Sequence, residues 1–482
     1  MTSKPIKTIG KKLEKEDKQL HKTALTNFSS PDLILKIYEE ISKTHLKDNS
    51  IKLLAFLTAS TGYLKYPEDH KSLALKGYRS VGKDNVMKQA VAHFPEEDVL
   101  FLTKGTEASM EDSIDEYKII VCSEINLKDE KGANAQIVET IKQITEGGTS
   151  VLKKKPKGRN WEAELIKQKQ KSVLYSTTES SDDEELNTRF IVGSVNASKE
   201  KIRNVNKNTL DGYSGKIKRE ISESWIKYGI KNLLIYNDVL FNLDWLVEYE
   251  KFFDCTDSRS MRDVKRFMSI ACAVAWLYQL QRKKDEYKRI IAEPFDFFIA
   301  MIISSDFFNH TYSGLGDQRL QQFIDAVNEY LDKENFKLNS DGTQNNLFPR
   351  HEIQKKLGVS TNTIKSLAKG CQSLSIIRYH HIDGNNIIYE RCQKGIKRVL
   401  IGVNWRDLYD EIKVSKGINY PKYMGKVLRK LDFICKEKEI KYKVYKKQTS
   451  LPHIFFNFDT LFLTPCSSTL HLGQSTKGGR GE

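Results

Sequence analysis

The stretch Gly77-Tyr78-Arg79-Ser80-Val81-Gly82-Lys83-Asp84 decides how the rest of the chain is interpreted. It matches the pattern GxxxxGK at every fixed position and lies between a predicted strand at 72–77 and a predicted helix at 84–94. Glycines let backbone N–H groups turn toward a phosphate, the lysine neutralises phosphate oxygens, and the amino end of the next helix adds a favourable dipole. The pattern therefore predicts a phosphate-binding loop, with a chance match as the alternative. Its expected ligands are Gly77, Ser80, Gly82, Lys83 and Asp84.

Two positions depart from the usual chemistry of such a loop. Asp84 stands where a Ser or Thr usually ligates Mg²⁺. The apolar run YKIIVCSE, residues 117–124, ends in Ser123-Glu124, with Ser where an Asp is usual. Together the departures suggest an exchange of carboxylate and hydroxyl, so that Asp84 and Ser123 still hold the metal; decay of the site is the alternative. With the loop present, Glu124 is the candidate for polarising an attacking water; an exposed Glu at the end of a strand is the alternative.

Short apolar runs alternate with helical segments around the loop, which predicts a parallel sheet with helices on both faces. The runs at 99–103, 117–124, 172–178 and 189–195 suit buried strands. The expected domains are a flexible basic arm at 1–28, an α/β core at 29–220, a helical lid or collar at 221–338, a winged helix at 347–404, a basic, aromatic-containing unit at 405–466 and a disordered tail at 467–482.

Taken together, these residues resemble the minichromosome-maintenance-like AAA+ ATPases, above all the shorter helicase-like proteins of plasmids, viruses and integrated elements. The resemblance runs from about Ser30 to Leu331 and includes FPEEDVLFLT at 94–103 and VETIKQITEGG at 138–148. It implies an α/β P-loop AAA+ core, ATP and Mg²⁺ as cofactors, and DNA and further copies of the chain, in a ring such as a hexamer, as partners. The implied activity is DNA-dependent ATP hydrolysis by a helicase or DNA-remodelling motor that replicates a mobile element or an archaeal-type genome. A DNA-binding initiator or regulator that binds nucleotide without turning it over is the alternative, because Asp84 and Ser123 put hydrolysis in doubt.

The resemblance also implies roles for residues far from the loop. VLYSTTE would sense the γ-phosphate through Thr177 or Thr178, and ELNTRF would present Arg189 to a neighbouring subunit as an arginine finger. Arg262 would lie on a helix that brings a second sensor arginine over the nucleotide. The stretch 149–163 falls where the family has a β-hairpin that touches nucleic acid, and its basic residues suit phosphate contacts. They are Lys153, Lys154, Lys155, Lys157 and Arg159; a solvated basic loop is the alternative.

The segment 348–391 has a helix-turn-helix pattern followed by a hairpin. Ile353 and Leu357 give the first helix an apolar side, and Gly358-Val359-Ser360 makes the turn. Asp383-Gly384 joins two β-like runs and predicts the wing. The outward residues expected to meet the major groove or its phosphates are Ser360, Thr361, Asn362 and Lys365. A winged helix used only for protein contacts is the alternative.

Bulk composition agrees with a polyanionic partner. The chain has 78 Lys and Arg against 63 Asp and Glu, a formal net charge of +15, and basic side chains gain affinity by displacing counterions from phosphates. The seven cysteines are scattered without a CxxC, so neither a disulfide framework nor a zinc site is indicated. The most apolar stretch, 268–280, is shorter than the roughly 18 residues of a spanning helix. We therefore expect a protein of the cytoplasm that does not enter membranes.

Overall fold

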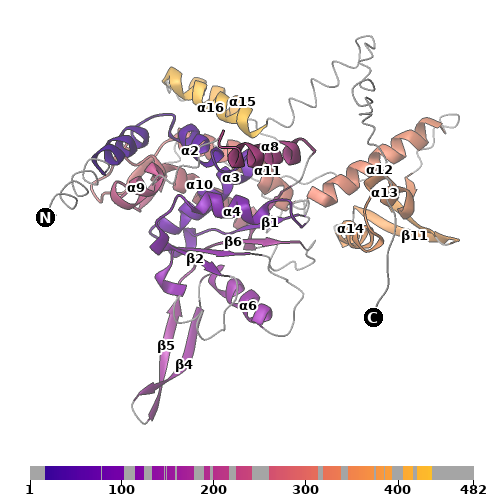
Figure 1. Cartoon of the computed structure of the whole chain (residues 1–482), viewed down its shortest axis with the longest axis horizontal. Coiled ribbons are helices and arrows are strands. Elements are labelled where there is room, and N and C mark those ends of the chain that lie inside the picture. Colours follow the sequence, from indigo (N-terminus) through magenta and orange to yellow (C-terminus); the bar gives the residue numbers. More distant parts are fainter. Residues whose placement is uncertain are drawn as a thin grey trace, which may run out of the picture. The chain divides into compact units, whose positions relative to one another are not determined.

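A sheet of five parallel strands lies at the centre of the computed structural model (Figure 1). Its order is β2-β3-β6-β1-β7, so every connection between neighbours in sequence crosses over rather than turning back. The strands are β1 (Leu73–Lys76), β2 (Val99–Leu102), β3 (Ile119–Cys122), β6 (Ser172–Thr177) and β7 (Ile191–Ser194). The predicted α/β fold with a parallel sheet is confirmed, and its topology is compatible with a P-loop core.

The structure describes a large part of residues 17–436. Within that span the undescribed positions are 78, 103–113, 124–132, 146, 148, 158–159, 179–188, 196–198, 217–223, 242–259, 313–317, 338–345, 374–375, 385, 393–404 and 416–420. The predicted tail at 467–482, the first part of the basic arm and the second part of the unit at 405–466 lie outside the described residues, as do Glu124 and Arg159.

Apolar side chains cover both faces of the sheet because successive residues of a strand point to opposite sides. Leu73 and Leu75 belong to a large apolar cluster, whereas Ala74 belongs to a smaller one. The large cluster takes in α3 (Asn49–Ser60) and α4 (Lys83–Val91), and the smaller one takes in α6 (Ala133–Thr145). The helices α4 and α6 accordingly lie on opposite sides of the sheet in Figure 1.

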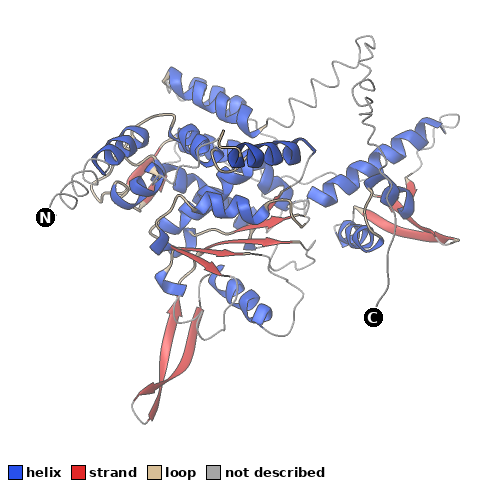
Figure 2. Cartoon of the chain, viewed as in Figure 1, coloured by secondary structure: helices blue, strands red, loops and turns tan. Residues whose placement is uncertain are grey.

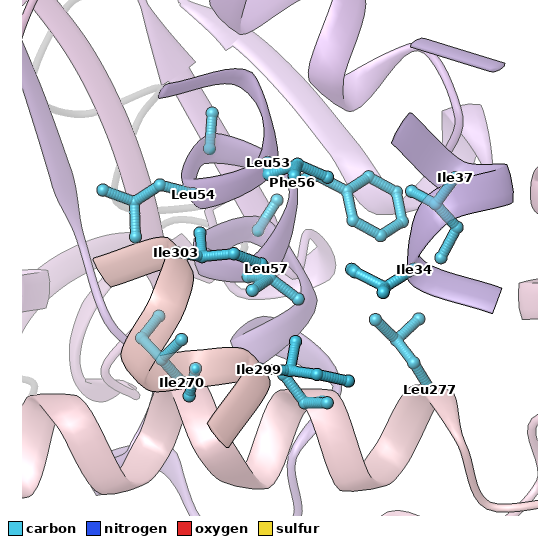
Figure 3. Close-up of a cluster of buried hydrophobic side chains, with 14 of the residues drawn as sticks. Ile34, Ile37, Leu53, Leu54, Phe56, Leu57, Ile270, Leu277, Ile299 and Ile303 are labelled. Carbon is cyan, nitrogen blue, oxygen red and sulfur yellow. The ribbon is translucent and has the colours of Figure 1, made fainter. Parts of the chain in front are cut away.

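The large cluster also includes helices from much later in the chain. Figure 3 shows Leu57 of α3 together with Ile270 of α10 (Ser260–Leu277) and Ile299 of α11 (Pro294–Tyr312). These helices come from the segment predicted as a lid at 221–338, along with α9 (Trp225–Asn232), the short strands β8 (Val239–Phe241) and β9 (Ile290–Ala292), and α12 (Gln318–Lys337). The helices of this segment divide between two apolar clusters, since α9, α10 and α11 join the large cluster and α12 joins another.

That other cluster forms the core of the helix-turn-helix segment. It combines α12 with α13 (Arg350–Leu357), α14 (Thr361–Ser373) and a three-stranded sheet. The sheet has the order β10-β12-β11 and consists of β10 (Leu347–Pro349), β11 (Ile377–Asp383) and β12 (Asn386–Arg391). Gly358 ends α13 with φ 63, a left-handed conformation that suits glycine. The two helices and the hairpin thus lie where the sequence predicts them.

Both ends of the described chain pack more tightly than expected. Residues 17–28, predicted as part of a flexible arm, are helical, and the buried ring of Phe28 meets that of Trp225 edge to face. The helices α15 (Trp405–Ser415) and α16 (Lys422–Cys435) contribute Leu408 and Leu428 to the large cluster. This part of the predicted basic unit is therefore continuous with the main core, because its helices bury apolar faces against α11.

Among the described residues, no helix is both long enough and apolar enough to span a lipid bilayer.

Candidate nucleotide-binding site

The loop that connects β1 to α4 lies at the carboxyl edge of the parallel sheet, where ligands of open α/β sheets bind. Strand β1 is flanked by β6 and β7, and β6 separates it from β3. Ser123 directly follows β3, and Thr178 directly follows β6. The sheet therefore brings the loop, Ser123 and Thr178 to one edge, as the sequence predicts, and Glu124 lies just beyond the last described residue there.

Two glycines of the loop are required by its backbone. A Cβ atom at Gly77 would lie 2.6 Å from the carbonyl oxygen of Val195, which is closer than Cβ atoms come to other atoms. Gly82 has φ 93 and immediately precedes α4, a conformation in which a side chain is strained. Ser80 also has a positive φ, 61. The fixed glycines of the sequence pattern thus match the positions that need them.

Lys83 folds back over this loop. Its side chain is buried, and Nζ donates a hydrogen bond to the carbonyl oxygen of Gly77 over 3.1 Å. A buried ammonium needs hydrogen-bond acceptors. An anionic ligand in the loop would therefore compete with the Gly77 carbonyl for this group.

Asp84 contacts a hydroxyl that the sequence analysis did not single out. Its Oδ1 accepts a hydrogen bond from Oγ of Ser176, which lies on β6. The hypothesis of an exchange paired Asp84 with Ser123, yet β3 is one strand further from β1 than β6 is. The hydroxyl run Ser176-Thr177-Thr178 was visible in the sequence, but only the position of α4 against β6 shows which member meets the carboxylate.

Thr178 is held from a distant part of the chain. Nη1 of Arg319, near the start of α12, donates to the Thr178 carbonyl oxygen over 2.6 Å. The guanidinium is a cation at the edge of the sheet that carries the loop, and no sequence pattern pointed to it. Among the described residues, no group of three or more His, Cys, Asp or Glu side chains could hold a metal ion by itself.

Arg189 and Arg262 lie together at the other edge of the sheet. Both line a pocket of about 330 Å³, whose walls include Ser72 just before β1 and Gln170 before β6. Arg189 donates to the carbonyl oxygen of Lys142, and Arg262 is exposed. The resemblance implies that Arg262 lies over a nucleotide, and within one chain this pocket is separated from the loop, which follows the opposite, carboxyl end of β1.

The pocket is strongly basic. One lining residue is acidic, Glu68, and five are lysines or arginines. The five are Lys71, Arg189, Arg262, Lys265 and Arg266. Burial lowers the pKa of Lys71 to about 8, and the positive charges of Arg266 and Lys265 act in the same direction, against Asp69 and Glu68. Such a concentration of positive charge suits the binding of an anionic group that belongs to another molecule.

The stretch 149–168 forms the expected β-hairpin. The strands β4 (Thr149–Lys157) and β5 (Asn160–Gln168) pair antiparallel along their whole length, from Thr149 opposite Gln168 to Lys157 opposite Asn160. Figure 2 shows the hairpin as two long strands that extend beyond the central sheet.

In the helix-turn-helix segment, Thr361, Asn362 and Lys365 are exposed at the start of α14, as predicted. Ser360 is exposed too, but it has a structural role. Its Oγ accepts from the backbone N–H of Thr363 over 3.2 Å and lies 2.8 Å from that residue's hydroxyl. This is the contact of a helix-capping serine.

A scan against models of known protein families and a search among curated proteins both find no match to this chain.

Proposed function

We propose that this chain is a DNA-dependent ATPase of the AAA+ type that works as a helicase or DNA-remodelling motor in the replication of a mobile element or an archaeal-type genome. One observation carries the proposal: a glycine-bounded loop with a buried lysine joins β1 to α4 at the carboxyl edge of a parallel sheet. Loop amides and the start of α4 would hold the phosphates of ATP, and Lys83 would exchange the Gly77 carbonyl for phosphate oxygens.

The residues beside the loop fit a magnesium ion bound with the nucleotide. Asp84 and Ser176 offer a carboxylate and a hydroxyl in contact with each other, and Mg²⁺ prefers such hard oxygens alongside phosphates and water. The ion would neutralise charge on the β- and γ-phosphates. Glu124 remains the candidate for orienting the attacking water, and Ser123 is a further hydroxyl at this edge.

The shared pocket of Arg189 and Arg262 supports a site completed between subunits. Both arginines lie at the amino edge of the sheet, so neither can serve the loop of its own chain. In a homo-oligomeric ring such as a hexamer, this basic pocket would face the nucleotide held by the loop of the next copy. An arginine in trans stabilises the charge of phosphoryl transfer.

Two elements favour DNA as the second partner. The hairpin β4–β5 carries Lys153, Lys154, Lys155 and Lys157 on a strand that extends from the core. The helix α14 exposes Thr361, Asn362 and Lys365 next to a hairpin that would act as the wing of a winged helix. The positive net charge adds attraction to phosphates.

Release of phosphate from ATP, with and without DNA, tests this function. The native chain should release phosphate faster with DNA, and Lys83→Ala should slow release by at least about 100-fold, the usual effect of removing one group that stabilises developing charge. Lys88→Ala is the matched control, because Lys88 is an exposed lysine of the same helix. If the native chain releases no phosphate, the motor function fails.

The alternative is a DNA-binding initiator or regulator that binds nucleotide without hydrolysing it. Asp84 favours it, because a carboxylate at the start of α4 adds negative charge beside the phosphates. Nucleotide binding that depends on Lys83, together with no DNA-stimulated release, would select this function over the motor.

A further inference from the structure

A second lysine contacts the loop. Lys201, on α8 (Lys199–Tyr213), donates a hydrogen bond from Nζ to the carbonyl oxygen of Val81 over 2.9 Å. A Cβ atom at Gly82 would lie 3.8 Å from the same Nζ, so the ammonium lies against the Val81–Gly82 peptide. The residue is buried, with 7% of its surface exposed. A buried ammonium is costly unless it is paired, so its place against the loop requires a partner charge.

Asp48 provides that charge. Its Oδ2 lies 2.5 Å from Nζ of Lys201 and 3.0 Å from Nε2 of His45. Burial pushes the pKa of Asp48 upward, but the hydrogen bonds from His45 and Lys201 and the charge of Lys201 outweigh it, and the pKa lies below its ordinary value. The carboxylate therefore stays ionised next to the ammonium and fixes it in place.

The same cluster reaches the first turn of α4. Nδ1 of His45 lies 2.8 Å from Nδ2 of Asn85, two residues after Lys83. The connection between α2 (Leu33–Ser42) and α3, the helix α8, the loop and the start of α4 are thus joined through His45, Asp48, Lys201 and Asn85. Since these segments are far apart in the sequence, the loop conformation depends on tertiary structure.

The hydrogen bond to Val81 has a stereochemical consequence. In a trans peptide the C=O and the following N–H point in opposite directions, so a Val81 carbonyl held toward Lys201 turns the Gly82 N–H away from it. Glycine restricts the orientation of an adjoining peptide less than any other residue, and Gly82 has φ 93. The hydrogen bond from Lys201 therefore fixes the orientation of the Val81–Gly82 peptide, which the glycine by itself leaves free.

We propose that Lys201 is a positioning residue for nucleotide binding: by holding the Val81 carbonyl, it orients the Gly82 N–H toward a phosphate of the bound nucleoside triphosphate. This rests on the proposed function. A donor that is already oriented in the free protein does not have to be ordered when the ligand binds, and affinity rises accordingly.

Calorimetric titration of the full chain with Mg²⁺ and ATP tests the proposal, together with a measurement of thermal unfolding. Lys201→Met should raise the Kd for ATP at least about tenfold, the effect of losing one charge-assisted hydrogen bond. Lys207→Met, at an exposed lysine of the same helix, should leave the Kd unchanged. Since Lys201→Met leaves the Asp48 carboxylate short of a cation, the double variant Asp48→Asn with Lys201→Met keeps the test valid if the single variant unfolds. It should show the same rise in Kd.

Hydrogen exchange without nucleotide gives a second readout. Backbone amides of the peptide 77–86 should exchange at least about tenfold faster in the Lys201 variants, because the Val81–Gly82 peptide loses its anchor. A purely structural role would lower the unfolding temperature and leave the Kd of the folded fraction at the native value. A native Kd in the Lys201 variants, or unchanged exchange in 77–86, overturns the positioning role of Lys201 and leaves the proposed function standing. A native chain that binds no nucleoside triphosphate overturns both this proposal and the proposed function.

Discussion

The carboxylate of Asp84, at the start of α4, accepts a hydrogen bond from the hydroxyl of Ser176 on the adjacent strand β6. The contact fixes the side chain that stands where a phosphate-binding loop usually carries a hydroxyl. A carboxylate and a hydroxyl are therefore both present beside the loop, because β6 is the strand next to β1.

This contact predicts that Ser176 contributes to the affinity for Mg²⁺. Ser176→Ala should raise the Mg²⁺ concentration needed for half-maximal ATP binding about tenfold, the usual effect of removing a partner that orients a metal ligand. ATP titrations at a series of Mg²⁺ concentrations measure it. Ser123→Ala is the comparison, and a larger effect there than at Ser176 would contradict the assignment.

The exchange of carboxylate and hydroxyl makes a separate prediction. Asp84→Ser and Ser123→Asp should each impair Mg²⁺-dependent nucleotide binding, and the double variant should restore it, because both metal-contacting oxygens are then present again. Two harmless single variants would refute the exchange and leave Ser176 as the hydroxyl partner of Asp84.

A site shared between subunits predicts complementation. Arg189→Ala should lower kcat about 1000-fold, as the loss of an arginine finger does, and Lys83→Ala should also be inactive. A mixture of the two inactive variants should recover phosphate release, since some interfaces then combine an intact loop with an intact Arg189. Mixtures that stay inactive, although the chains assemble, would place Arg189 outside the reaction.

DNA contact by α14 predicts a change in salt dependence. Lys365→Ala should weaken DNA binding and reduce the slope of log K against log salt by about one, which is the signature of one lost phosphate contact. Fluorescence anisotropy with a labelled duplex at several salt concentrations measures the slope. Lys333→Ala, at an exposed lysine of α12, is the control, and equal slopes for both variants would exclude Lys365 from the interface.

His93 predicts loss of stability in acid. Burial lowers its pKa from 6.5 to about 4, with Glu40 opposing the shift, and its Nδ1 lies 2.8 Å from Oγ of Ser224. The folded protein therefore holds the neutral ring, while the unfolded chain takes up a proton below about pH 6.5. The contribution of His93 to the free energy of unfolding should fall by about 3 kcal/mol between pH 6.5 and pH 4 and change no further below that. Urea unfolding at each pH measures it, and His93→Gln should lose this part of the pH dependence.

Much of the architecture could be predicted because it is encoded locally. The apolar runs at 99–103 and 172–178 lie within a residue of strands β2 and β6, since buried parallel strands need unbroken apolar sequence. The glycines of the loop also match their backbone requirements. Local pattern was less informative at 405–435, because many basic residues lie between the apolar residues that α15 and α16 bury.

The residues around the loop were harder to predict. Lys201 and Val81 are 120 positions apart, and Lys201 and Asp48 are 153 apart. No periodicity or spacing links such residues, because their contact results from helix packing. The basic residues Arg189 and Arg262 could be singled out by resemblance, but their common pocket at the edge opposite the loop required the structure.

Calorimetric titration of ATP with Mg²⁺ into the full chain, and into Lys83→Ala and Lys88→Ala, tests nucleotide binding by the loop most directly. We expect binding by the native chain and by Lys88→Ala, and a Kd at least about tenfold higher for Lys83→Ala. No binding by the native chain, or equal Kd values for all three proteins, would contradict the claim that residues 77–84 hold a nucleoside triphosphate.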